Sequence, residues 1–146
     1  MIPLILAALL AFPLPPLGAT LGSGTPYHNI IADTASMTTT LPATGLATYY
    51  SPGVFEKVIK NQLRYGNIQP DACPDCVGYA ALLWPADVGR VVCVNGYGPL
   101  LVVDNASNAH RPGLIARGWI VDIQWEVWQE LGFPNAPTLI TVAECS

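Results

Sequence analysis

The sequence predicts a small all-β domain that folds as a closed barrel of about six strands with two short helices. Three observations predict this class. Glycine and proline are frequent, with 13 and 14 copies, which favours short strands joined by turns over a helical bundle. The apolar stretches are short and are separated by turn signals. Several of them are apolar along their whole length, so both faces of those strands must be buried.

Each element follows from a local pattern. Gly53–Arg64 places its apolar side chains at helical spacing and its charges on the other side, and Asp122–Gly132 aligns its tryptophans in the same way. Both are therefore predicted to be helices, the second ending at its glycine. Asn95–Gly98 predicts a tight turn because Asn-Gly readily takes positive φ. The strands are predicted at Leu46–Tyr50, Val77–Leu83, Gly89–Val94, Pro99–Asp104, Gly118–Asp122 and Thr138–Glu144.

Residues 1–19 predict a secretory signal peptide. They carry no charged side chain, and the apolar run Leu4–Phe12 is shorter than the roughly 20 residues that span a bilayer. Small residues ending at Ala19 suit a signal peptidase. Because no Lys or Arg precedes the run, a retained amphipathic tail or a short membrane anchor is the alternative. We favour export to an extracellular or periplasmic location, with no stable membrane insertion after processing.

The rest of the chain is predicted to be a tether followed by one domain. Residues 20–44 contain Ser, Thr and Pro without a hydrophobic period, which predicts a flexible tether, and the barrel is expected at 45–146. Hydrophobic residues form 51% of the chain, enough to bury a core. The net charge of −4 argues against nucleic acid as a partner. We expect a monomer.

The cysteines form an even set in a small, exported chain, which favours disulfides. Three connectivities are possible for four cysteines. We favour Cys73 with Cys76, and Cys93 with Cys145. The second pair joins a cysteine in an apolar strand to one at the end of the last strand, so it would tie the C-terminus to the barrel.

The Cys73-Pro-Asp-Cys76 motif has two other interpretations. It could bind a metal together with Asp75 and His110, but a zinc site needs four well-placed nitrogen or sulfur ligands, and the only other histidine, His28, lies in the predicted tether. A thioredoxin-like redox role would need a βαβ pattern around the motif, which the sequence lacks. We expect no metal and no cofactor.

Two apolar strands end on an acid. Leu100–Val103 leads into Asp104, and Trp119–Val121 leads into Asp122. We predict that the two acids share one site at the ends of two strands. Partial desolvation and a like charge both raise the pKa of a carboxyl group. One of the two acids would then stay protonated near neutral pH and could act as a proton donor.

Four stretches, in this order, resemble the double-psi β-barrels of rare lipoprotein A, the expansins and the barwin-like endoglucanases. They are "GLATYYSPG", "AALLWPADVGRVVCV", "LLVVDNA" and "ARGWIVDIQWEVWQELG", and together they cover most of residues 45–145. The resemblance implies a six-stranded double-psi barrel with an open groove for glycan chains. It also implies a secreted protein that acts on or loosens a cell-wall polysaccharide, either peptidoglycan or β-glucan.

The resemblance implies the site residues as well. Thr48 matches the groove threonine, Tyr50 matches the tyrosine more loosely, and Asp104 and Asp122 match the two acids. With a glycan as substrate, Asp122 is the predicted general acid. Asp104 is its charged partner, and the two hydroxyl side chains bind the acids or the sugar. Trp84, beside a proline in a loop, is the predicted platform for a sugar ring.

The chain departs from the lytic transglycosylases of this group. Leu82 stands near the place of their histidine, Glu56 is the only acid near the place of their glutamate, and Gln124 replaces a serine in the last stretch. These departures argue against peptidoglycan cleavage by their mechanism, and lytic transglycosylase-like cleavage stays open beside endoglucanase-like cleavage. A non-catalytic, barwin-like carbohydrate-binding or inhibitor module is the alternative to a glycan-cleaving enzyme or an expansin-like loosening protein.

Plainer roles are open for the same residues. Asp122 can cap the N-terminus of the helix that follows it, and Asp104 can begin an Asx turn. Arg111 and Arg117 can form a salt bridge with Asp104 or contact acidic sugars, of which the salt bridge is the plainer role.

Overall fold

The computed structural model describes residues 34–146. The predicted signal peptide and the first part of the predicted tether lie outside these residues. All six predicted strands are present, which confirms an all-β barrel class. The strands are β1 (Ala43–Tyr50), β2 (Gly78–Leu82), β3 (Val91–Val94), β4 (Tyr97–Asn105), β5 (Trp119–Gln124) and β6 (Thr138–Glu144).

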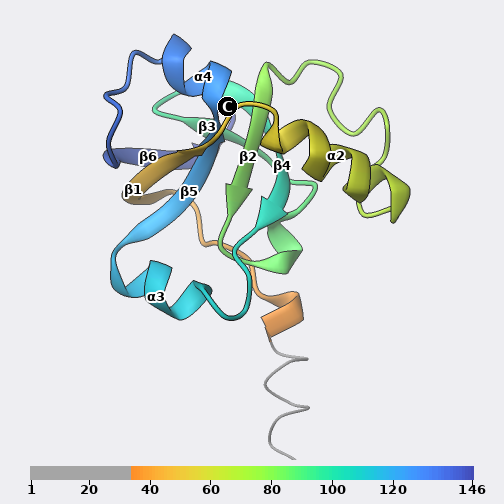
Figure 1. The fold of residues 1–146 in the computed structure, drawn as a ribbon, viewed down its shortest axis with the longest axis horizontal. Helices are drawn as coiled ribbons and strands as arrows, with labels where there is room; N and C mark the ends of the chain where they lie inside the picture. Colours follow the sequence, from red (N-terminus) through yellow and green to blue (C-terminus); the bar gives the residue numbers. More distant parts are fainter. Residues whose placement is uncertain (1–33) are drawn as a thin grey trace, which may run out of the picture.

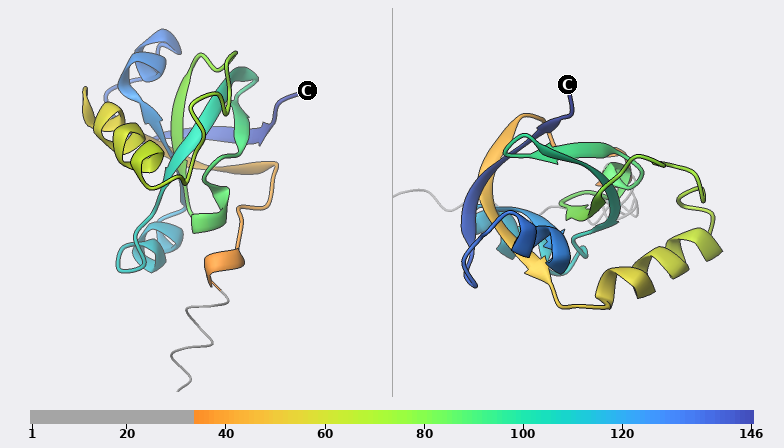
Figure 2. Two further views of the ribbon diagram at one scale, coloured as in Figure 1. Left: turned by 90° about the vertical axis from the view of Figure 1, so that its right-hand side faces the viewer. Right: turned by 90° about the horizontal axis from the view of Figure 1, so that it is seen from above.

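The strands close into a barrel in the order β1-β5-β2-β4-β3-β6, which the right-hand view of Figure 2 shows from one end. β1 is parallel to β5, and β2 is parallel to β4. The other neighbouring pairs are antiparallel. The two parallel pairs are joined by β5 against β2, so β1, β5, β2 and β4 form one continuous wall.

The described chain has more helix than the sequence predicts. α2 (Val54–Arg64) is present as expected, and α4 (Trp125–Glu130) is shorter than predicted because the residues before it extend β5. The prediction of only two short helices is wrong, because α3 (Arg111–Ala116) lies between β4 and β5. Its six residues are too few for a periodic pattern, and they include a proline and a glycine. Proline is accepted in the first turn, where its missing N–H needs no partner.

Both faces of β4 are buried, as its apolar sequence predicts. Leu100 and Val102 point into the barrel interior with the core side chains of the other strands. Leu101 and Val103 face outward and pack under α2 against Phe55. Figure 1 shows α2 lying along this outer side of the barrel, whereas α3 lies at a different side.

The disulfide prediction is confirmed. Cys73 is bonded to Cys76 in the connection between α2 and β2, and Cys93 in β3 is bonded to Cys145 just after β6. Since the first pair is oxidised, its sulfurs do not form the metal site considered for this motif. Disulfides are typical of proteins that fold in an oxidising, extracellular environment. None of the helices between Thr34 and Ser146 has the length and apolar character needed to cross a bilayer.

Part of the predicted tether packs on the barrel through a buried carboxylate. Thr39 donates its N–H (2.9 Å) and its hydroxyl (2.7 Å) to the two oxygens of Asp87. Asp87 also accepts the N–H of Trp84 at 3.0 Å and the guanidinium of Arg90 at 2.8 Å. The ordered region therefore begins before residue 45. Composition alone does not reveal this, because the partner of Thr39 is 48 residues away.

Replacing Asp87 with alanine is expected to lower the free energy of unfolding by about 3 kcal/mol. The carboxylate is fully buried. Its loss leaves the donors of Thr39 and Trp84 without their acceptor and removes one of the two ion pairs of Arg90. Urea denaturation of the variant measures the change. Asp71→Ala, in an exposed loop, is the control and should change the free energy by less than about 0.5 kcal/mol. A loss below 1 kcal/mol for Asp87→Ala would contradict the prediction.

Candidate functional site

The strand register brings the two predicted acids to one wall of the barrel. Ala81 of β2 pairs with Asp104 of β4 on one side and with Asp122 of β5 on the other. The Cα atoms of the acids are therefore two inter-strand spacings apart, about 10 Å. The residue between them has only a methyl side chain, so no bulky group separates the two carboxyls.

A β-bulge explains how an acid can follow a buried strand. Ala80 pairs with Val102 while the next residue pairs with Asp104, so Val103 is an extra residue in β4. Strict alternation would turn Asp104 toward the interior with Val102. A bulge instead places two successive side chains on the same side, so Asp104 emerges on the outer surface beside Val103.

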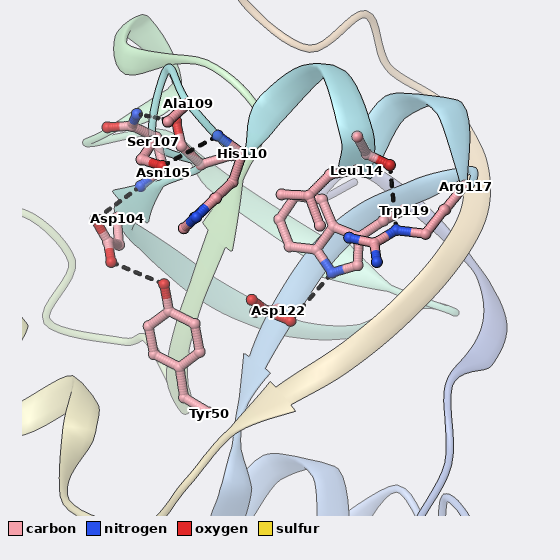
Figure 3. A pocket seen from close by; sticks show the side chains of 12 residues that line it. Tyr50, Asp104, Asn105, Ser107, Ala109, His110, Leu114, Arg117, Trp119 and Asp122 are labelled. Atoms are coloured by element: carbon pink, nitrogen blue, oxygen red, sulfur yellow. Dashed lines mark hydrogen bonds between the residues drawn. The ribbon is translucent and has the colours of Figure 1, made fainter.

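The acids line a cavity of about 940 Å³ between this wall and α3. Figure 3 shows both carboxyls on the strand side, opposite Leu114 of α3 and Arg117, the residue that follows α3. A second cavity of about 310 Å³ shares Leu114, Arg117, Trp119 and Asp122 with the first and continues to Leu46 and Pro137. We call the two cavities together the acid groove. Asp122 lies where they meet.

The surroundings of Asp122 favour its protonated form. Thr48 donates its hydroxyl to Oδ1, and the indole N–H of Trp119 donates to the same oxygen at 3.1 Å. Burial raises the pKa of Asp122, these two hydrogen bonds lower it, and the charge of Asp104 raises it further, so that the pKa lies above its ordinary value. Because both donors engage Oδ1, Oδ2 is the oxygen suited to carry the proton.

Asp104 is held in a more polar setting. It accepts the hydroxyl of Tyr50 on Oδ2 and the N–H of Asn105 on Oδ1, both at 2.9 Å. Burial raises the pKa of Tyr50, as do the charge and hydrogen bond of Asp104 and the charge of Asp122. The phenol therefore stays protonated and remains a donor at physiological pH. Its ring stacks on Phe55 of α2, with the ring centroids 4.5 Å apart, which fixes its position.

Two plainer interpretations of the acids do not fit this geometry. Asp122 as a helix cap is wrong, because Gln124 occupies the N-cap position of α4 and makes no capping bond with its side chain. The carboxylate of Asp104 accepts the N–H of the very next residue, whereas an Asx turn joins residues two apart.

Trp84 does not line the acid groove. It lies against a different cavity, on the other side of α3, where the guanidinium of Arg111 sits 4.7 Å from its ring centroid. Arg111 is buried and donates to the carbonyl oxygens of Leu83 and Ala106. Trp84 and Arg111 therefore anchor the loop that leads into α3, on the side opposite the acids.

The predicted salt bridge to Asp104 is wrong. Within residues 34–146 the ion pairs are those of Arg90 with Asp87 and with Glu144. Arg117 lines the acid groove but donates its Nε–H to the carbonyl oxygen of Gly113 at 3.1 Å.

His110 lies in the groove, whereas the sequence pattern suggested for this residue only the role of a metal ligand. Its imidazole points into the larger cavity, toward the space between the two acids (Figure 3). A histidine six residues after a strand-ending acid, followed by Arg-Pro, could have signalled a loop that returns over the strand ends. The second missed role is that of Trp119, whose indole N–H binds Asp122.

Comparisons of the chain with models of protein families, with curated proteins and with solved structures found no match. The class of protein is therefore defined by fold and site alone. It is a six-stranded closed β-barrel with two disulfides and a surface groove that contains two neighbouring carboxyls.

Proposed function

We propose that this protein is a secreted double-psi β-barrel of the rare lipoprotein A and expansin type that cleaves a cell-wall polysaccharide in the acid groove. One observation carries the proposal: a carboxyl with a raised pKa, Asp122, lines both cavities of the groove, and a second acid lines the larger one. The two parallel strand pairs within a closed barrel support the double-psi assignment. So does the fact that Thr48, Tyr50, Asp104 and Asp122, which the resemblance implies as site residues, are joined through side-chain hydrogen bonds or line one groove.

The proposed reaction is hydrolysis of a glycosidic bond. Protonated Asp122 donates its proton to the bridging oxygen, the bond from that oxygen to the anomeric carbon breaks, and the leaving sugar departs as an alcohol. Asp104 takes a proton from a water molecule whose oxygen bonds to the anomeric carbon. Afterwards Asp104 loses this proton to solvent and Asp122 regains one, so the site is restored.

The spacing of the acids supports a water-mediated reaction. Enzymes that invert the anomeric centre hold their two carboxyls about 6.5–9.5 Å apart to admit a water molecule, whereas retaining enzymes hold them about 5 Å apart. The Cα atoms of Asp104 and Asp122 are two inter-strand spacings apart in the register, and the two carboxyls bind other partners and not each other. Hydrolysis with inversion is therefore the outcome that we expect.

The lytic transglycosylase mechanism receives no support from this chain. Leu82, near the place of the histidine, is fully buried in the barrel interior. Glu56 is exposed on α2 and does not line the groove. The products are expected to be reducing sugars and not anhydro sugars.

A second candidate function is glycan binding or wall loosening without cleavage. The hydrogen bonds of Asp104 favour it, because each carboxylate oxygen already accepts one, from Tyr50 and from Asn105. With both oxygens already accepting hydrogen bonds, Asp104 has fewer acceptor positions left to hold a water molecule. The same groove would then bind a glycan chain without breaking it.

The decisive experiment incubates the purified protein with peptidoglycan, cellulose and chitin. New reducing ends, identified by mass spectrometry as products of hydrolysis, are the expected result. Retention of the protein on an insoluble glycan without any released sugar would favour the second candidate. If none of the three glycans releases sugar or retains the protein, both candidate functions are contradicted.

A further inference from the structure

We infer that the acid groove selects a glycan that bears carboxylate groups, and that Arg117 binds the carboxylate of a sugar unit beside the bond at Asp122. This inference rests on the proposed function, because it names the substrate class of the same groove. It would make Arg117 a residue that determines specificity.

Arg117 is free to bind an anion. It ends α3 and is exposed, and no carboxylate within residues 34–146 forms an ion pair with it. Its Nε–H donates to the carbonyl oxygen of Gly113, which restrains the plane of the guanidinium and leaves the two terminal nitrogens available. Two parallel N–H donors match the two oxygens of a carboxylate, so the pair can be bidentate.

The other described arginines do not offer this arrangement. Arg90 is paired with Asp87 and Glu144, and Arg111 is buried against main-chain carbonyl oxygens and Trp84. Arg64 is exposed at the end of α2 but does not line the acid groove. Arg117 is therefore the arginine in the described part of the chain that can meet a ligand in this groove.

The charges are unevenly distributed along the groove. Arg117 and Asp122 line both cavities, whereas Asp104 lines only the larger one. A sugar carboxylate at Arg117 therefore lies toward the smaller cavity, away from Asp104. Figure 3 shows Arg117 and Asp104 on opposite sides of the drawn cavity.

The smaller cavity is suited to the rest of such a sugar. Leu46, Leu114 and Pro137 supply apolar surface, and the buried Trp119 lines both cavities. Sugar rings offer apolar C–H faces that pack on surfaces of this kind. The contact at Arg117 is partly shielded from water once a ligand covers it, which makes an ion pair stronger than an open surface pair.

The test uses two pairs of matched glycans. One pair is a cello-oligosaccharide and the same oligosaccharide oxidised to carboxylates at C6. The other is bare peptidoglycan strands with free lactyl carboxylates and the same strands after conversion of those groups to amides. The purified protein is expected to bind the charged member of at least one pair about 10-fold more tightly, as calorimetry would measure. Arg117→Gln should abolish this preference, so that the variant binds the charged and the neutral member of each pair with equal affinity.

Arg64→Gln is the matched control, since it removes the same charge from an exposed site outside the groove, and it should keep the preference. Equal affinity for both members of each pair, or a preference that survives Arg117→Gln, would overturn the inference. Cleavage of both members at equal rates overturns the inference and leaves the proposed function intact. Binding of the charged member through Arg117 without any cleavage supports the inference and contradicts the proposed cleavage. No binding of any glycan defeats both.

Discussion

Replacing Asp122 with asparagine is expected to reduce glycan cleavage by at least about 100-fold while leaving the protein folded. Asparagine keeps an oxygen that can accept the hydrogen bonds of Thr48 and Trp119, so the site should retain its shape. It lacks the acidic proton that the bridging oxygen of the glycan requires. Initial rates of reducing-end release measure the effect, and glycan affinity should change little.

Asp71→Asn makes the same chemical change at an exposed position and should leave the rate unaltered. The pH profile gives a second readout. Because the active form of Asp122 is protonated, the wild-type rate should fall as pH rises through its raised pKa, and the residual rate of Asp122→Asn should lack this fall. A loss of less than 10-fold would show that Asp122 is not the general acid.

The same residue links stability to pH. Its pKa is higher in the folded protein than the ordinary value of 3.8, so the folded state binds the proton more tightly than the unfolded state. Its contribution to stability is fully present below about pH 3.8 and is lost as pH rises through the raised pKa. Asp122→Asn removes this loss, so the variant should gain stability relative to the wild type as the pH approaches neutrality.

Removing the Cys93–Cys145 disulfide by replacing both cysteines with alanine is expected to lower the free energy of unfolding by about 4 kcal/mol. The bond is between residues 52 apart, so the loss releases a long loop in the unfolded chain. It also frees the end of β6, which pairs with β3 and with β1 to close the barrel. Domains of this size have a total free energy of unfolding of only about 5–15 kcal/mol, so the expected loss is a large fraction of it.

The Cys73–Cys76 bond provides an internal comparison. Its cysteines are only 3 residues apart, and the same relation gives a loss of about 2 kcal/mol for the matching double substitution. Urea denaturation of both variants ranks the two bonds. Equal losses, or a larger loss for the short loop, would contradict the argument from loop length.

The sequence predicted the strands well because burial leaves a local pattern. The continuous apolar run of β4 follows from an inner face in the barrel and an outer face under α2. The strand order was not predictable in the same way, since it depends on pairings between segments far apart in the chain. α3 was not predicted because it is short and contains Pro112 and Gly113, two residue types that usually indicate a turn.

The candidate site was predictable in its residue types but not in its geometry. Asp104 and Asp122 stand out because each follows an apolar strand. Their common outward direction depends on a bulge and on pairing with Ala81, which neither strand shows alone. His110 and Arg117 reach the groove only because α3 folds back over it, and Trp84 falls on the far side of the same helix.

Asp122 is a partly desolvated acid whose pKa is raised by burial and by the charge of Asp104. Carboxyl-carbon NMR, followed as a function of pH in the wild type and in Asp104→Asn, measures this directly. We expect Asp122 to titrate above 3.8 in the wild type and at a lower pH once the neighbouring charge is removed. Titration of Asp122 at or below 3.8, with no response to Asp104→Asn, would contradict it.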